Sequence, residues 1–356
     1  MKTGSITFTL DTGKCPKWLF CRMKKLGGIV LELIVEEYGI DELIKRLSHP
    51  VWFQSLGCAL AFDWNSSGLT VTLTAALKEA LKERNLGIYI CGGKGRTSKK
   101  TLFELERLSE ILNFDTNNYI KLSKLIAKVD NTLIQDGFNL YHHTFIISKN
   151  KTWAVIQQGM NTKLLLARRY HWSYFNINEN DITTEPHLGI VSDLKLSKVF
   201  NLTDKISQEN KMLTLELINQ PKSLIKDLNL FLNQNKNIPN LFLNRSDFKY
   251  HPVLEEKFDL NRIKNIINQA SFLEIKTFED LLVNTKIGPK TLRAISLVGE
   301  LVYNKPLSYK DPARYSFSFG GKDGIPYPVD KNVYDEVISL LNKALNISRK
   351  KLFLIK

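Results

Sequence analysis

The order of apolar and polar positions divides the chain into two parts with different periodicities. Up to about residue 200, short alternating or continuously apolar runs are interspersed with helical segments, which is typical of a mixed α and β fold. From about residue 204, apolar residues recur at helical spacing. The sequence therefore predicts an α+β protein, with a mixed α/β domain over residues 1–200 and an all-α domain over residues 201–356.

Local signals place several elements of the first domain. The run HTFIIS, the polar tip KNKT and the run WAVIQQ predict a β-hairpin. Thr101 and Glu104 have the spacing of a capping box, so a helix is expected to begin at Thr101. Further strands are expected at residues 86–93 and 189–191, and further helices at residues 16–37, 41–47, 70–83 and 119–135.

One segment of the second domain, residues 277–304, carries the clearest binding pattern. Its sequence, TFEDLLVNTKIGPKTLRAISLVGELVYN, predicts two helices joined by a tight turn in which Gly288 supplies backbone freedom. The unpaired N–H groups at the start of the second helix, near Thr291, favour a phosphate, and Lys286 and Lys290 add positive charge. We therefore predict a helix-hairpin-helix that holds the DNA backbone through these four residues without reading the base sequence.

The charge and composition of the chain favour some partners and exclude others. The 50 Lys and Arg residues exceed the 36 Asp and Glu residues, which gives a formal net charge of +14. A surface of this charge attracts polyanions, and with the hairpin it makes DNA the expected partner. The four cysteines form no C-x-x-C pair, so neither a disulfide framework nor a zinc site is expected. No signal segment or membrane span is found, so the protein is expected in the cytoplasm with no membrane partner; its oligomeric state is left open.

Two shorter stretches combine cations with groups suited to nucleic acid. The segment GGKGRTSKK lies between a predicted strand and a predicted helix, where glycine-rich turns bind phosphate, and it offers Lys94, Arg96 and Lys99. It lacks the P-loop pattern, so ATP is not expected. The segment ARRYHW places Arg168 and Arg169 beside aromatic residues, a mixture that suits stacking on unpaired bases.

Polar residues around the predicted hairpin suggest a second site. Asp130 and Asp136 precede the hairpin, His143 opens its first strand and Gln157 closes its second. A magnesium-dependent nuclease needs two or three neighbouring carboxylates, and Asp63, Asp130 and Asp136 can supply them. A hydrolase that uses His143 without a metal is an alternative, and purely structural roles as caps and internal hydrogen-bond partners account for the same residues. No cofactor is expected apart from magnesium in the nuclease.

The turn TKIGPKT and the downstream motif IPYPVD resemble the helix-hairpin-helix DNA glycosylase superfamily. In its lyase members the hairpin lysine forms a Schiff base with the deoxyribose and an aspartate assists. The resemblance implies that Lys290 is the nucleophile and Asp330 the carboxylate of an enzyme acting on damaged DNA. Lys290 would have to lose its proton through burial or a cationic neighbour such as Lys286. Asp330 is equally well placed to cap a following helix.

Motifs along almost the whole length resemble a mostly archaeal family known as domain of unknown function 763. They include TGKCPKWLF, FQSLGCALAFDWNSSG, GGKGRTSKKT, WAVIQQGMN, ARRYHW and FSFGGKDGIPYPVD. The family name implies no activity. The expected functions are therefore those that the residues suggest. They are a DNA repair or processing enzyme of the glycosylase/lyase kind, a nuclease with its site in the first domain and the hairpin as a DNA clamp, or a DNA-binding protein without enzymatic activity.

Overall fold

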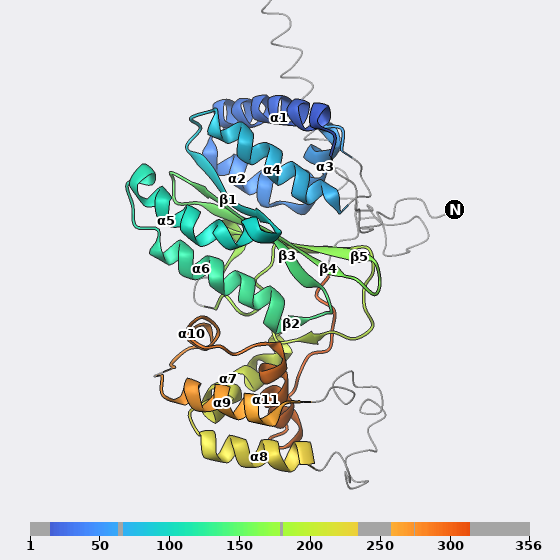
Figure 1. Ribbon diagram of the computed structural model, residues 1–356, viewed down its shortest axis with the longest axis vertical. Coiled ribbons are helices and arrows are strands. Elements are labelled where there is room, and N and C mark those ends of the chain that lie inside the picture. Colours follow the sequence, from blue (N-terminus) through green and yellow to red (C-terminus); the bar gives the residue numbers. More distant parts are fainter. Residues whose placement is uncertain (1–14, 63–66, 179–180, 234–257, 274, 314–356) are drawn as a thin grey trace, which may run out of the picture.

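The computed structural model describes residues 15–62, 67–178, 181–233, 258–273 and 275–313 and shows an α+β protein (Figure 1). Its centre is a five-stranded antiparallel sheet in the order β1-β3-β4-β5-β6. The predicted hairpin is confirmed as β3 and β4, which pair in antiparallel register. The strands are β1 (Ile88–Lys94), β3 (Asn139–Ser148), β4 (Trp153–Asn161), β5 (Leu166–Ser173) and β6 (Gly189–Ser192), and a separate small sheet joins β2 (Ile134–Gln135) to β7 (Phe200–Asn201).

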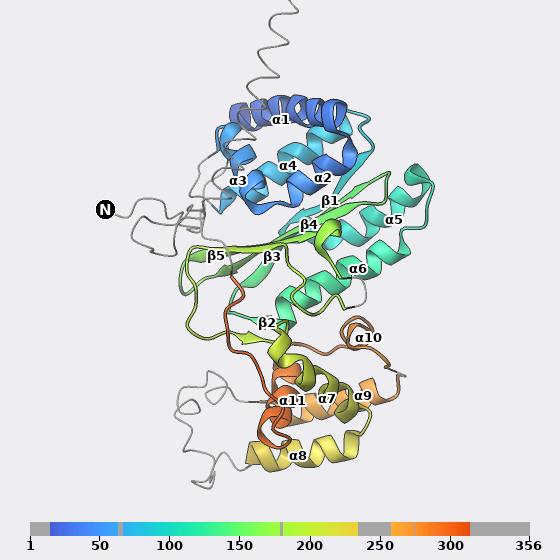
Figure 2. The same ribbon diagram turned by 180° about the vertical axis from the view of Figure 1, so that it is seen from behind.

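Helices cover both faces of the large sheet (Figures 1 and 2). One face packs against α1 (Lys17–Tyr38), α2 (Ile40–Ser48), α3 (Pro50–Ala59) and α4 (Gly68–Lys82). The other face packs against α5 (Thr101–Leu112) and α6 (Asn117–Lys128). Because neither face meets solvent, the central strands are buried on both sides and show no simple alternation of apolar and polar residues.

The second part of the described chain is helical and lies beside α6 and β2 (Figure 1). Its helices are α7 (Gln208–Ile218), α8 (Pro221–Asn233), α9 (Leu260–Ser271), α10 (Phe278–Asn284) and α11 (Pro289–Leu301). A single apolar cluster contains Phe145 and Ile126 from the first part and Leu292 from the second. The proposed division at residue 200 stays a prediction, because this apolar core is continuous across it.

After α11 the chain returns to the large sheet. The Val199 N–H donates to the Tyr309 carbonyl oxygen (2.9 Å), and the Asn201 N–H donates to the Ser308 carbonyl oxygen (2.9 Å). Two residues later, Asp311 reaches the buried guanidinium group of Arg168 on β5 (2.8 Å). The helical part is therefore attached to the sheet at its start and again at its end.

Three local features differ from the sequence prediction. The helix expected at 119–135 ends at Lys128, and a π-helical turn, Val129–Leu133, leads into β2. Helix α5 begins at Thr101 as predicted, but Glu104 does not complete a capping box, because its carboxylate accepts the Gly92 N–H (2.7 Å) instead. The segment ARRYHW, which was expected to contact nucleic acid, forms the buried strand β5.

Of the helices within the described ranges, none combines the length and the apolar character that crossing a bilayer requires.

Candidate active site

A chain of hydrogen-bonded side chains crosses the sheet face that α6 covers. The Ser123 hydroxyl on α6 lies 2.8 Å from Nε2 of His143 on β3. Nδ1 of His143 lies 2.7 Å from Oε1 of Gln157 on β4, because these two residues are directly paired across the strands. The Gln157 amide nitrogen then donates to Oδ2 of Asp130, in the turn that follows α6. Four residues from four elements thus form one continuous series of contacts.

The buried carboxylate sets the direction of every hydrogen bond in this series. The Gln157 amide nitrogen faces two oxygens that can only accept, Oδ2 of Asp130 and the Ile126 carbonyl. Oε1 of Gln157 therefore points to His143 and requires a proton on Nδ1. Nε2 of His143 is then unprotonated, so the Ser123 hydroxyl donates to it. This is the polarity in which a histidine accepts the proton of a serine nucleophile.

Burial keeps His143 in its neutral form. The side chain is enclosed by the sheet and α6, and this desolvation lowers the pKa of His143 below its ordinary value. The hydrogen bond to Gln157 and the charge of Asp130 oppose the shift without reversing it. His143 is therefore able to accept a proton over the whole neutral range of pH.

A cavity of about 240 Å³ opens onto Ser123 and His143. Its other walls come from the start of α5, the outer turn of α6 and the beginning of β3, and Lys99 and Lys124 are exposed on its lining. Strand β1 lies close against the backbone of His143, because a Cβ atom at Gly92 would lie 2.2 Å from the His143 carbonyl oxygen. The cavity thus places a hydroxyl group and a neutral imidazole below two ammonium groups.

The basic segment predicted to bind phosphate contributes Ser98 and Lys99 to the lining of this cavity. Lys94, Arg96 and Lys99 are all exposed. Gly92 has a φ of +88°, a backbone conformation that favours glycine. The Glu104 carboxylate holds the Gly92 N–H, and Lys78 pairs with the same carboxylate (2.7 Å). The loop therefore presents its cations from a fixed turn.

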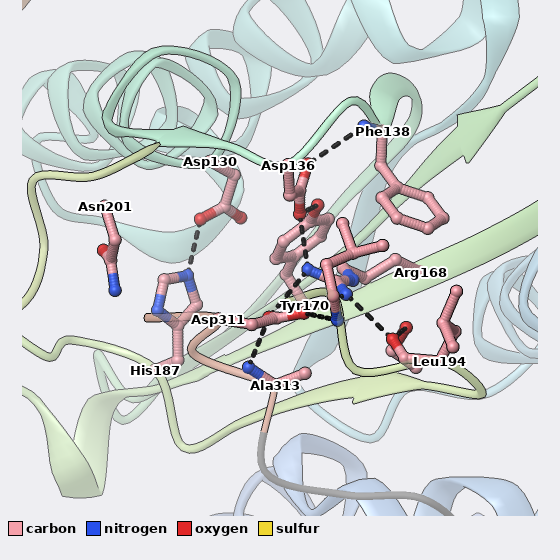
Figure 3. A network of polar contacts seen from close by, with 12 residues as sticks. Asp130, Asp136, Phe138, Arg168, Tyr170, His187, Leu194, Asn201, Asp311 and Ala313 are labelled. Carbon is pink, nitrogen blue, oxygen red and sulfur yellow. Dashed lines mark hydrogen bonds and ion pairs between the residues drawn. The ribbon is translucent and has the colours of Figure 1, made fainter. Parts of the chain in front are cut away.

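Asp130 also contacts a second histidine on its opposite side (Figure 3). Its Oδ1 lies 2.5 Å from Nε2 of His187, and its Oδ2 accepts the indole N–H of Trp172 (3.0 Å). Beside this group, the Arg168 guanidinium contacts Asp136 (2.9 Å) and both carboxylate oxygens of Asp311. Asp130 is thus shared between the residues of the active-site cavity and a second network.

A protein-family model, described as protein of unknown function (DUF763), matches residues 4–329. The chain belongs to this family. No curated protein and no solved structure matches it. The resemblance seen in the sequence motifs is therefore confirmed for the DUF763 family. Because that family name states no activity, the chemistry of the DUF763 chain has to be inferred from the geometry of its side chains.

Two arginines and a threonine expected to contact nucleic acid are buried in the DUF763 chain. Arg168 is 0% exposed and paired with carboxylates. Arg169 is also 0% exposed, and it donates to Nε2 of His171 (2.8 Å) and to Oε1 of Gln54 (3.0 Å). Thr291 is 4% exposed. The side chains of Arg168 and Arg169 are therefore engaged inside the protein, and their burial gives no support to a contact with nucleic acid, which stays a prediction for these three residues.

The carboxylates proposed for a magnesium site do not meet at one point. Asp130 accepts hydrogen bonds from Gln157 and Trp172, whereas Asp136 accepts from Arg168 and the Tyr170 hydroxyl. Burial raises the pKa of Asp136, and the charge of Arg168 opposes that shift. Within the described ranges, no three His, Cys, Asp or Glu side chains lie close enough together to hold a metal ion. Asp63, the third proposed ligand, lies outside the described residues.

The turn between α10 and α11 keeps part of its predicted exposure. Lys286 and Lys290 are exposed, and Gly288 is half-buried. Gly288 borders open space, because a Cβ atom added there would meet nothing within 4 Å. The exposure of Lys290 gives no support to the expected loss of its proton by burial. Its proposed catalytic partner, Asp330, lies outside the described residues, so the lyase stays a prediction.

The same turn is docked beside the active-site cavity. The Lys128 ammonium group on α6 donates to the Ile287 carbonyl oxygen (2.8 Å). Gln135 donates to the Pro289 carbonyl oxygen (3.0 Å). Lys124, which lines the cavity, precedes Lys128 by one helical turn and therefore lies on the same side of α6. The turn and the cavity are neighbours along this helix.

Sequence reasoning missed three residues of these networks. Ser123 occupies an ordinary position in an amphipathic helix, and His187 lies in an irregular loop, so no local pattern distinguishes either residue. Asp311 pairs with Arg168 across 143 positions of sequence. Only the folded arrangement brings these side chains to their partners. The pairing of His143 with Gln157, in contrast, follows from the hairpin register alone.

Proposed function

We propose that this DUF763 protein is a hydrolase that cleaves phosphodiester bonds of nucleic acid at the cavity of Ser123 and His143. The observation that carries this proposal is the oriented series Ser123–His143–Gln157–Asp130, which ends in a cavity lined by lysines. A hydroxyl hydrogen-bonded to a neutral, oriented imidazole is the arrangement required for nucleophilic catalysis. The basic surroundings favour an anionic substrate.

The proposed reaction has two steps. Oγ of Ser123 attacks the phosphorus atom while Nε2 of His143 takes the hydroxyl proton. The bond from phosphorus to the leaving sugar oxygen breaks, and that oxygen takes the proton from His143. A water molecule then attacks the phosphoserine and gives its proton to His143, and Ser123 recovers a proton as its bond to phosphorus breaks. Lys99 and Lys124 would stabilise the negative charge on the phosphoryl oxygens.

The turn between α10 and α11 supplies a second contact to the same strand in this proposal. Lys286 and Lys290 are exposed beside the cavity, because Lys128 anchors the turn to the end of α6. A helix-hairpin-helix clamp of this kind would bind backbone phosphates without regard to base sequence. The second, helical part of the chain would then act as the DNA-binding domain, and the sheet with its helices would carry the chemistry.

The experiment is cleavage of labelled single-stranded DNA, duplex DNA and RNA by the full chain, with EDTA present. The expected result is cleavage of at least one substrate that persists in EDTA and is lost in Ser123→Ala. Cleavage that requires added magnesium, or that survives in Ser123→Ala, would overturn the proposed mechanism. A covalent adduct trapped by borohydride on abasic DNA, and lost in Lys290→Gln, would favour the lyase instead.

Gly288→Val is expected to lower DNA affinity while the chain stays folded. The valine side chain would project into the space where a phosphate would approach the start of α11, and the backbone there (φ −122°, ψ 177°) accepts any residue. We expect a fall of about tenfold, equivalent to about 1.4 kcal/mol, measured by gel shift. Affinity should also fall steeply with salt concentration, because phosphate contacts release counterions. Unchanged affinity would remove the turn from the proposed interface.

The pH dependence of cleavage is expected to follow the buried state of His143. The unprotonated imidazole is the active form, and it is present above the pKa of the folded protein. Because burial lowers that pKa, the acidic limb of the rate profile should lie below about pH 6.5, the usual value for histidine. A profile of kcat/KM against pH checks this, and an acidic limb above pH about 6.5 would argue against His143 as the base.

A further inference from the structure

A second cavity, of about 360 Å³, lies on the other side of Asp130. Its walls come from residues 185–190, 195–204 and 310–313, so it forms where the segment returning from α11 meets the sheet. Cavities of about 300–1,000 Å³ at such junctions commonly bind small molecules. The active-site cavity of Ser123 and His143 shares no lining residue with this one.

His187 presents a hydrogen-bonding atom to this cavity. The residue is 7% exposed, and its ring packs edge-on against Trp172 with the centroids 4.6 Å apart. Oδ2 of Asp130 accepts the N–H donors of Gln157 and Trp172, and Oδ1 is in contact with Nε2 of His187. Nδ1 is the ring nitrogen that Asp130 does not engage, and it points away from Asp130 on the side of Asn201 (Figure 3). Such an atom can form a hydrogen bond with a ligand hydroxyl group, which is both a donor and an acceptor.

The rest of the lining separates into a charged rim and an apolar part. Two exposed lysines, Lys195 and Lys310, lie at the rim, and the lining also contains the carboxylates of Glu185, Asp204 and Asp311. Glu185 pairs with Lys205 (3.4 Å), Asp311 pairs with Arg168 (2.8 Å), and Asp204 accepts the Ser308 hydroxyl (2.9 Å). Each carboxylate is thus already held by a protein donor, and the two lysines are the cations of the rim. Ile190, Pro312 and Ala313 supply the apolar surface. An anionic group therefore suits the rim, and a ring or sugar face suits the apolar part.

A strained turn shapes one edge of the cavity. Glu185 has a φ of +43°, which residues other than glycine rarely adopt. The turn is held because the Glu185 N–H donates to the Thr203 carbonyl oxygen (2.8 Å) on the facing wall. Strain of this kind persists where the surrounding structure fixes it and is frequent at binding sites. Here it places His187, two residues later, against Asp130.

We propose that this cavity binds a small phosphorylated sugar, of the size of a nucleoside monophosphate. Lys195 and Lys310 contact the phosphate, Nδ1 of His187 forms a hydrogen bond with a sugar hydroxyl group, and the apolar wall packs against the remaining ring. This site is independent of the proposed hydrolase, because binding can be measured whether or not the chain cleaves nucleic acid. In this proposal Asp130 contacts the ligand-binding histidine His187 through Oδ1 and the active-site series through Oδ2.

The experiment is isothermal titration of the full chain with adenosine 5′-monophosphate, ribose 5-phosphate, inorganic phosphate and adenosine. We expect one equivalent of each phosphorylated sugar to bind, and adenosine to give no heat. The double variant Lys195→Gln/Lys310→Gln should bind about tenfold or more weakly, because charge-assisted hydrogen bonds are lost. Lys198→Gln, an exposed lysine of the same segment outside the lining, is the matched control and should bind normally.

His187→Gln tests the hydroxyl contact and should weaken ribose 5-phosphate more than inorganic phosphate, which has no sugar hydroxyl. Because His187 is buried, the circular dichroism of the His187→Gln variant is compared with that of the unaltered chain to check that it is folded. The lysine variants test the same cavity without changing a buried residue. The proposal is overturned if neither phosphorylated sugar binds, if the lysine double variant binds as tightly as the control, or if inorganic phosphate binds as tightly as ribose 5-phosphate.

Discussion

Ser123→Ala is expected to reduce phosphodiester cleavage by at least about 10³-fold, since removing a serine nucleophile costs up to about 10⁶ in kcat where this has been measured. The hydroxyl group is the atom that attacks, and no other hydroxyl is hydrogen-bonded to Nε2 of His143 within the described part of the chain. The variant should fold, because the change removes one hydrogen bond and about 1 kcal/mol of stability. Single-turnover cleavage of the best substrate measures the effect.

A matched control for Ser123→Ala lies on the neighbouring helix. The Ser109 hydroxyl on α5 donates to the Phe114 carbonyl oxygen (3.0 Å), away from the cavity, so Ser109→Ala loses a similar bond. Its cleavage rate should be unchanged. The cleavage rate of Gln157→Leu should lie between those of the two serine variants, about 10²-fold below the rate of the unaltered chain. The orientation of His143 is lost in this variant, while the nucleophile remains. Equal rates for Ser123→Ala and Ser109→Ala would remove Ser123 from the chemistry.

Asp311→Ala is expected to lower the free energy of unfolding by about 3 kcal/mol, the lower end of the usual effect of breaking a buried ion pair, because Arg168 keeps its contact with Asp136 (2.9 Å). The Asp311 carboxylate accepts from both terminal nitrogens of Arg168 (3.0 and 2.8 Å) and from the Leu196 N–H (2.7 Å). The side chains of Arg168 and Asp311 are both 0% exposed, so the pair is desolvated in the folded chain. Urea unfolding followed by circular dichroism measures the change.

Glu209→Gln provides the comparison for Asp311→Ala. Glu209 pairs with Lys305 at a similar distance (2.9 Å), but the side chains of Lys305 and Glu209 are 41% and 63% exposed. An exposed pair contributes at most about 1 kcal/mol, so this variant should unfold close to the unaltered chain. If the two variants lower the free energy of unfolding equally, the buried Arg168–Asp311 pair does not stabilise the fold more than an exposed ion pair does.

The elements with one dominant pattern were predictable from the sequence. The hairpin of β3 and β4 was predictable, because a polar tip separates two runs of residues that favour β-strands. Strand β5 was not, because it carries Arg168 and Arg169, and charged residues usually indicate a surface. Both guanidinium groups are accommodated by partners from distant segments, which a local pattern cannot reveal.

The candidate site was predictable by residue type but not by arrangement. Asp130 and His143 stood out because carboxylates and histidines next to a hairpin suit catalysis, and the structure places both in one series. Asp130 and Asp136 accept from different donors, and within the described residues they belong to no group of three side chains that could hold a metal ion. Ser123 belongs to the site only because α6 packs over the sheet at the position of His143, which a local sequence pattern does not reveal.

The return of the chain to the sheet after α11 has a consequence for synthesis on the ribosome. Arg168 is made long before Asp311, and the intervening helices must emerge first. Until residue 311 leaves the exit tunnel, the nascent sheet holds a buried cation with Asp136 as its acidic neighbour. Contacts of such long sequence separation form late. The first half is therefore expected to reach its final state only when the second half has been translated, so a shortened chain that ends near residue 204 would be a poor substitute for it.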